Sequence, residues 1–218
     1  MRILALDTSS ERGSVALTLN GEPGGEVRLG DSVQHSERLF RSIDFLLETS
    51  GVRVEDVDLF VAARGPGSFT GLRVGLAAVE GLAFTAGRPV RAISTLAAIA
   101  WQIGPSTSPI APLIDARRGE VYGALFRREG PGLVEVRGPG AERPDRFLGS
   151  LPDEPVVFCG PGVKHCMAEI RMHTGWTIGK ADPYLAMTLA EMAAAGHDEP
   201  FEPLYLRAPG SVTRSQGT

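Results

Sequence analysis

The sequence predicts an α/β protein built from two related halves, because strand and helix patterns alternate and one hairpin pattern occurs twice. In the first half, an apolar run ends in Asp7, passes a polar turn that holds Gly13, and returns as an alternating strand. In the second half, an apolar run ends in Asp115, passes Gly119 and returns in the same way. Two hairpins of one design, about half a chain apart, indicate an internal duplication.

The remaining elements follow from the hydrophobic periodicity and from the turn residues. In the first half we expect strands at 2–8, 13–20, 25–30, 57–63 and 90–93, and helices at 34–50, 70–87 and 95–103. In the second half we expect strands at 111–115, 121–125 and 155–159, and helices at 163–173 and 184–195. The stretch 128–155 is rich in Gly and Pro, and we expect a loop-heavy insertion there.

This order predicts an N-terminal lobe at 1–104, a reduced C-terminal lobe at 105–207 and a mobile tail at 208–218. Two related lobes with crossover helices are expected of the actin/Hsp70-like (ASKHA) fold, in which the lobes flank a nucleotide cleft. This expectation is an analogy at the level of the fold and does not assign an activity.

Composition sets the class of protein. Hydrophobic residues make up 43% of the 218 residues and charged residues 22%, which suits a protein with a buried core. The net charge of −4 gives no global attraction to nucleic acid, so any such role needs a partner or a local basic patch. Cys159 and Cys166 lack zinc or redox spacing, and we expect both to be buried and reduced.

The sequence also bears on location. Asp7 ends the first apolar run too early for a signal peptide. The long uncharged window at 93–114 contains Gly and Pro residues that a membrane-spanning helix would not tolerate. We therefore expect a cytoplasmic protein without a membrane partner.

A glycine-rich loop, Gly65–Gly75, joins a buried strand to a helix, and Ser68 or Thr70 can cap that helix. Such a loop can hold an anion at the helix N-terminus, with Ser68 as a contact. It can equally be a tight turn without a ligand. The residue pattern leaves both interpretations open.

Six strings resemble one known family. They are ILALDTSS at 3–10, HSERLF at 35–40, GPGSFTGLRVGLAAVEGLA at 65–83, ISTLAAIA at 93–100, DARRGEVY at 115–122 and LYLR at 204–207. In this order, across nearly the whole chain, they resemble the TsaB (YeaZ) family, bacterial partners in tRNA threonylcarbamoyladenosine synthesis. Pro161, between Gly160 and Gly162, departs from the family pattern, which usually has an aspartate there.

The resemblance also implies what is missing. TsaD proteins, the relatives that catalyse the transfer, bind a metal through a His-x-x-x-His pair on a helix. By position, Thr95 and Ile99 stand where that pair would be, and neither can bind the metal. The four histidines contain no such pair, and no nucleophile, base and orienting acid can be assigned. We therefore expect no metal site and no catalytic residue.

Four residues are candidates for a nucleotide or phosphate contact: Asp7, Ser68, Asp115 and Arg117. The two aspartates could hold a water or a metal between the lobes, or each could cap its own hairpin turn. Glu11 at the first hairpin tip would repel a phosphate, so ATP hydrolysis by this chain alone is not expected. Arg117 and Arg118 could contact nucleotide, the ATPase TsaE or tRNA phosphates, or form a solvated turn.

The helices at 34–50 and 70–87 are candidates for a protein interface. The second is apolar around its whole circumference, whereas the first has one apolar stripe that could cover the sheet or face a partner. The resemblance implies that these helices pair with TsaD, or with a second copy of the chain when TsaD is absent. The candidate interface residues are Leu39, Ile43, Leu46, Gly71, Leu72, Gly75, Leu76 and Val79.

The resemblance thus implies a non-catalytic, dimerising subunit that supports TsaD, which moves threonylcarbamoyl to N6 of the adenosine next to the tRNA anticodon. TsaE would join the complex, and tRNA would bind through the complex. The chain would carry no cofactor of its own. Whether ATP or ADP binds at its interface with TsaD stays open. Two alternatives remain: an actin-like kinase or ATPase with nucleotide between Asp7 and Asp115, and a metal-dependent glycopeptidase.

Overall fold

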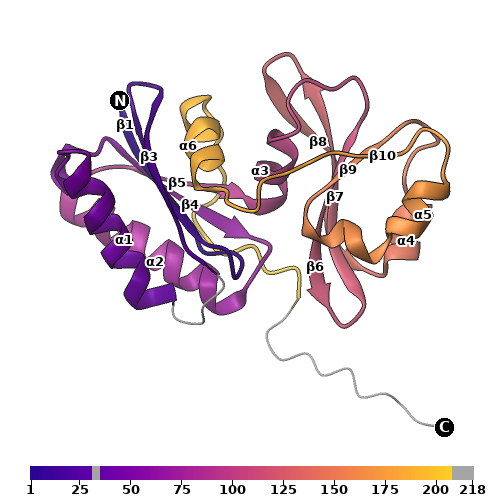
Figure 1. The fold of residues 1–218 in the computed structure, drawn as a ribbon, viewed down its shortest axis with the longest axis horizontal. Helices are drawn as coiled ribbons and strands as arrows, with labels where there is room; N and C mark the ends of the chain where they lie inside the picture. Colours follow the sequence, from indigo (N-terminus) through magenta and orange to yellow (C-terminus); the bar gives the residue numbers. More distant parts are fainter. Residues whose placement is uncertain (31–34, 208–218) are drawn as a thin grey trace, which may run out of the picture.

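The computed structural model describes residues 1–30 and 35–207 (Figure 1). The expected tail at 208–218 and the expected helix start at residue 34 lie outside the described residues.

Two five-stranded sheets form the framework. The first sheet has the order β3-β2-β1-β4-β5, and the second has the order β8-β7-β6-β9-β10. In each, the first strand pairs antiparallel with the second and parallel with the fourth. The equal order confirms the duplication that the two hairpins predicted.

The strands of the first sheet are β1 (Arg2–Asp7), β2 (Ser14–Leu19), β3 (Glu22–Arg28), β4 (Leu59–Gly65) and β5 (Val90–Ser94). Those of the second are β6 (Ile110–Arg117), β7 (Glu120–Glu129), β8 (Gly132–Glu142), β9 (Val157–Cys159) and β10 (Thr177–Ile178). The helices are α1 (His35–Thr49), α2 (Phe69–Ala86), α3 (Thr95–Trp101), α4 (Pro144–Gly149), α5 (Met167–Met172) and α6 (Ala186–Ala194). Short 3₁₀ helices lie at Val54–Asp56 and Pro161–His165.

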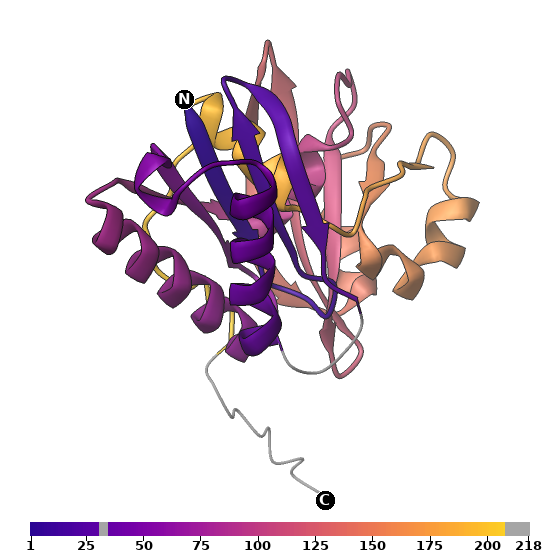
Figure 2. The ribbon, with the colours of Figure 1, turned by 60° about the vertical axis from the view of Figure 1, so that its left-hand side comes forward.

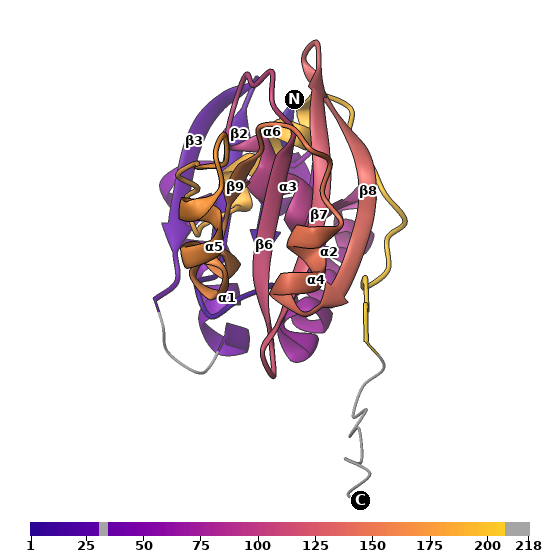
Figure 3. The same cartoon turned by 90° about the vertical axis from the view of Figure 1, so that its right-hand side faces the viewer.

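The elements stack in five layers. Helices α1 and α2 cover the outer face of the first sheet (Figures 1 and 2), and α4 and α5 lie on the outer side of the second (Figure 3). Between the sheets lie α3 and α6, whose apolar residues form one core with both sheets. Although α6 follows the second sheet in the chain, it packs against β1 and β2 of the first.

Three expectations about the second half need correction. The stretch 128–155 is not a loop-heavy insertion, because it contains β8 and α4. Strand β8 lies at a sheet edge, where Gly and Pro are tolerated, and its register with β7 shifts opposite Gly138 and Pro139. The helix expected at 163–173 is divided into a 3₁₀ turn and α5, and the short strand β10 was not expected.

Both cysteines are buried and unbonded, as expected. Burial raises the pKa of Cys159 to about 12 and that of Cys166 to about 11, so neither thiol ionises near neutral pH.

Helix α2 is, by length and composition alone, apolar enough to cross a membrane. The core helix of a globular protein passes the same test. In this chain α2 packs on β4, and seven of its residues are buried.

Candidate functional site

The glycine loop packs directly against the turn between β1 and β2. A Cβ atom at Gly67 would lie 2.3 Å from the Ser9 carbonyl oxygen, and one at Gly71 would lie 2.0 Å from that of Thr8. At Gly75 a Cβ atom would lie 2.2 Å from Thr8 Oγ1. The glycine spacing therefore lets a helix and a hairpin approach more closely than any side chain would allow.

Hydrogen bonds hold this contact together. Thr8 Oγ1 donates to the Gly71 carbonyl (2.7 Å), and the Ser68 amide donates to the Ser9 carbonyl (2.7 Å). Ser68 is the N-cap of α2, since its Oγ accepts a hydrogen bond from the Gly71 amide (3.2 Å). Ser68 was one of the two caps that the sequence predicted. Its hydroxyl and its amide are both engaged within the chain, which favours the tight-turn interpretation of the loop.

Asp7 lies at the end of β1 and is fully buried. Its Oδ1 accepts a hydrogen bond from the Ser9 amide (2.9 Å), whereas Oδ2 has no hydrogen-bond partner. Burial raises the pKa of Asp7 to about 6, although the hydrogen bonds with Ser9 act in the opposite direction. The carboxyl group therefore caps its own turn and is costly to ionise.

Asp115 occupies the equivalent position at the second hairpin. Its Oδ1 accepts a hydrogen bond from the Arg117 amide (2.7 Å), and its Oδ2 lies 3.1 Å from His165 Nε2 and 3.6 Å from Lys164 Nζ. Partial burial raises the pKa of Asp115, but the Arg117 amide, His165 and Lys164 together outweigh it and hold the pKa below its ordinary value. Each candidate aspartate thus caps its own hairpin turn, one of the two roles that the sequence left open.

The tips of the two hairpins meet. Arg117 Nη2 lies 3.2 Å from Glu11 Oε1, and both side chains are about three-quarters exposed. The ion pair joins the first hairpin to the second at the end of the molecule where β1 and β6 finish.

A segment near the C-terminus also joins the two halves, and we call residues 204–207 the strap. The Leu204 amide donates to the Arg64 carbonyl (2.7 Å), and the ring of Tyr205 packs on Phe69 with ring centroids 4.9 Å apart. At the other end, Arg207 donates to the Ala116 carbonyl (3.1 Å) and forms an ion pair with Glu120. The strap therefore runs from β4 and α2 to the β6–β7 hairpin.

These contacts do not fit a nucleotide phosphate. A phosphate cradle needs free backbone amides and small residues at the hairpin tip. Here the Thr8–Ser9 turn is packed onto α2, and Glu11 adds a negative charge at the tip. Within the described part of the chain, no group of three or more His, Cys, Asp or Glu side chains could hold a metal ion.

The eight candidate interface residues are buried. Leu39, Ile43, Leu46, Leu76 and Val79 pack in one core cluster with β1, β2 and β4. Gly71, Leu72 and Gly75 are also buried, the two glycines against Thr8. Their direct contact with a partner stays a prediction, but the structure gives them the role of core residues.

Other residues form the outer faces of α1 and α2. Phe40 and Phe45 of α1 are 48% and 60% exposed, and Phe84 of α2 is 89% exposed. Ala77 and Gly81 lie on the exposed side of α2, where a Cβ atom on Gly81 would meet nothing within 4 Å. The sequence showed apolar residues around the whole of α2. Only the burial of its residues in the structure shows which side of the helix is exposed.

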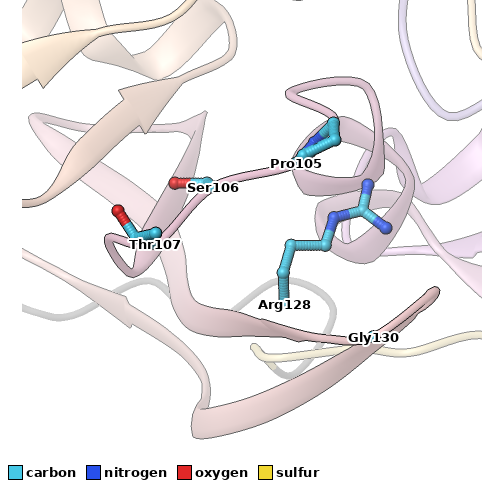
Figure 4. A pocket seen from close by; sticks show the side chains of 5 residues that line it. All are labelled: Pro105, Ser106, Thr107, Arg128 and Gly130. Carbon is cyan, nitrogen blue, oxygen red and sulfur yellow. The ribbon is translucent and has the colours of Figure 1, made fainter.

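A hollow of about 550 Å³ lies elsewhere, beyond the end of α3 (Figure 4). It is lined by Pro105, Ser106, Thr107, Arg128 and Gly130. The Arg128 guanidinium donates to the Gly104 carbonyl (3.0 Å) and to that of Trp101, and it lies 4.3 Å from the centroid of the Trp101 ring. Arg128 is the one cation among the five lining residues, and its guanidinium is bound to the end of α3. These five residues suggest no catalytic site.

Comparison with known proteins shows the family to which this chain is similar. Residues 19–177 match the family model "TsaD: tRNA N6-adenosine threonylcarbamoyltransferase". The chain is 40% identical over 136 residues to the tRNA threonylcarbamoyladenosine biosynthesis protein TsaB of Escherichia coli K12, a match that covers 61% of this chain and 58% of that protein. The chain thus spans somewhat more than half the length of this curated relative.

Solved structures agree. YeaZ from Pseudomonas aeruginosa superposes with a TM-score of 0.79 at 30% identity, over 94% of this chain and 99% of that one. Component A of (R)-2-hydroxyglutaryl-CoA dehydratase from Acidaminococcus fermentans shares the fold alone, with a TM-score of 0.52 at 13% identity over 89% of this chain and 96% of that one. The expected actin/Hsp70-like fold is confirmed. The range that the family model matches is 73% of this chain, and this chain covers 99% of the YeaZ structure at 30% identity. The chain therefore belongs to the TsaB (YeaZ) family.

Proposed function

We propose that this chain is the non-catalytic partner of the threonylcarbamoyltransferase TsaD in the synthesis of tRNA threonylcarbamoyladenosine. It binds TsaD through the outer faces of α1 and α2 and supports the transfer that TsaD catalyses. TsaE joins this complex, tRNA binds to the assembly, and the complex works in the cytoplasm. In the absence of TsaD, a second copy of the chain occupies the same faces.

The observation that carries the proposal is the exposure of Phe40, Phe45 and Phe84 on two helices that lie side by side over one sheet (Figure 2). Large apolar side chains on an outer face are typical of a protein interface, where their burial provides most of the binding free energy. The small residues Ala77 and Gly81 beside Phe84 would allow another helix to approach closely.

The contacts at the hairpins support the non-catalytic part of the proposal. The two aspartates cap turns, the glycine loop packs on Thr8 and Ser9, and Thr95 and Ile99 stand buried on α3 where a metal-binding pair would be. No intrinsic cofactor is proposed. Titration calorimetry with Mg-ATP tests the rival kinase or ATPase function, which predicts micromolar binding by the isolated chain.

One substitution in α2 tests the interface. Phe84→Asp places a charge on the exposed face without touching the core, and should abolish co-elution with TsaD from the same organism. Met172→Asp is the matched control, because Met172 is 81% exposed on α5, a helix on the opposite side of the molecule from α1 and α2 (Figure 1). Co-elution of the Phe84 variant at wild-type level would contradict the proposed interface.

A further inference from the structure

The β6–β7 hairpin ends in two consecutive arginines with left-handed backbone conformation. Arg117 has φ 63° and Arg118 has φ 57°, and Gly119 continues the turn with φ 76°. Arg117 pairs with Glu120 across the strand ends, so Arg118 and Gly119 form a two-residue turn. Asn, Asp or Gly adopt this conformation at low cost, whereas arginine has neither the short polar side chain of Asn and Asp nor the missing Cβ atom of Gly. Two arginines at such positions indicate that their side chains, rather than the turn, determine the residue type.

Further cations gather around this hairpin. The two hairpin turns (8–13 and 115–120), the 3₁₀ turn Pro161–His165 and the strap meet at one end of the molecule (Figures 1 and 3). Their cationic residues are Arg12, Arg117, Arg118, Lys164 and Arg207, and their carboxylates are Glu11, Asp115 and Glu120. With Asp7, which the first hairpin contributes as the second contributes Asp115, these segments carry five cations and four carboxylates, a formal net charge of +1 in a chain of net charge −4.

Two of these cations, Arg117 and Lys164, have largely exposed side chains. Arg117 is 75% exposed, and its partner Glu11 is 76% exposed, so their ion pair lies in water and is readily exchanged. Lys164 is 62% exposed and lies 3.6 Å from Asp115. The hairpin also projects beyond the body of the second sheet, where a rigid polyanion could reach both arginines (Figure 3).

From this geometry we propose that the β6–β7 hairpin tip contacts the phosphate backbone of RNA, through Arg117 and Arg118 with Lys164 beside them. The inference rests on the proposed function, which makes tRNA the RNA that the complex handles. Arginine forks bind phosphate oxygens in two-point contacts, which suits a positioning contact without base recognition. The acidic remainder of the chain would keep the RNA at this end.

The test is a titration of transfer RNA with the chain–TsaD complex and, at low ionic strength, with the isolated chain. Arg117→Gln/Arg118→Gln should lower the affinity for tRNA roughly tenfold near physiological salt and reduce the slope of log affinity against log salt by about 1.5 to 2. The matched control is Arg53→Gln/Arg88→Gln, which removes the same charge. Both control residues form ion pairs at the opposite end of β1, near Arg2.

The outcomes separate the two proposals. Equal tRNA affinity and salt slope in wild type and hairpin variant would overturn the RNA contact, as would an equal loss in the control. Unchanged tRNA binding with weakened binding of TsaD or TsaE would overturn it in favour of a protein contact. Failure of the wild-type chain to bind TsaD or to stimulate modification would instead refute the proposed function, whatever the titration of the isolated chain shows.

Discussion

At the scale of single residues, Thr8 and Ser9 explain why glycines recur in the loop before α2 and in its first turns. Each of Gly67, Gly71 and Gly75 faces an atom of that turn at a distance that no Cβ atom could keep. The glycine pattern was visible in the sequence, but its partner was not, because the β1–β2 turn lies about sixty residues away in the chain.

Two glycine substitutions in α2 test this explanation. Gly71→Ala should lower the free energy of unfolding by about 1 to 3 kcal/mol, because the new methyl group meets the Thr8 carbonyl and the hairpin must move. Gly81→Ala is the control and should raise it by about 0.5 to 1 kcal/mol, since that site is open and alanine favours a helix. Chemical denaturation measures both, and equal effects would contradict the close-packing role.

Asp7 makes stability depend on pH in a defined direction. Its pKa rises from 3.8 in the unfolded chain to about 6 in the folded one, so the folded state holds the proton more tightly. The free energy of unfolding should therefore fall as pH rises from about 4 to about 6, by up to about 3 kcal/mol, and this contribution should be level at higher pH.

The variant Asp7→Asn isolates this effect, because asparagine can still accept the hydrogen bond from the Ser9 amide but does not titrate. Denaturation at several pH values should show wild-type stability, relative to the variant, declining over that range. A relative stability that increases with pH would mean that the ionised carboxylate has a partner, such as a bound cation, at Oδ2.

At the scale of elements, the sequence predicted most helices and strands, and the reasons for the failures are physical. Strand β8 was missed because an edge strand tolerates the Gly and Pro residues that normally indicate a loop. On α2 the periodicity could not show which face meets the sheet, because apolar residues surround the helix. The interface candidates on α2 are buried within the chain, whereas Phe84 lies on the open face, and contact of these candidates with a partner stays a prediction.

The strap is the element whose role the sequence left undetermined. Its motif was recognised from the resemblance, yet only the structure shows that Tyr205 contacts Phe69 and Arg73 while Arg207 contacts the β6–β7 hairpin. The strap therefore ties together two elements that belong to different sheets.

Removing the two strap side chains should loosen this connection. In Tyr205→Ala/Arg207→Ala, amide hydrogen exchange should accelerate in the β6–β7 hairpin and in the first turn of α2, while the central strands β1 and β4 keep their protection. Arg53→Ala is a suitable control, because its ion pair with Asp56 is confined to one turn. Unchanged exchange at both ends of the strap would show that it contributes nothing to their stability.

At the scale of the whole molecule, the internal duplication could be predicted from two hairpins whose first apolar runs end in Asp7 and Asp115, and the structure adds the equal strand order of the two sheets. The fold alone would suggest a nucleotide between these aspartates, and the local contacts argue otherwise, since both carboxylates cap turns and the hairpin tips are joined to each other. The actin-like fold is thus present, while contacts within the chain occupy the two turns at which the fold would suggest a phosphate.

We propose that TsaD requires this chain, although the chain does not itself perform the transfer. The most direct measurement is formation of threonylcarbamoyladenosine on tRNA in a reaction reconstituted with TsaD, TsaE and a supply of threonylcarbamoyl-adenylate, with the chain present, omitted, or added without TsaD. We expect product only when TsaD and the chain are both present. Product from the chain without TsaD, or full activity when the chain is omitted, would contradict it.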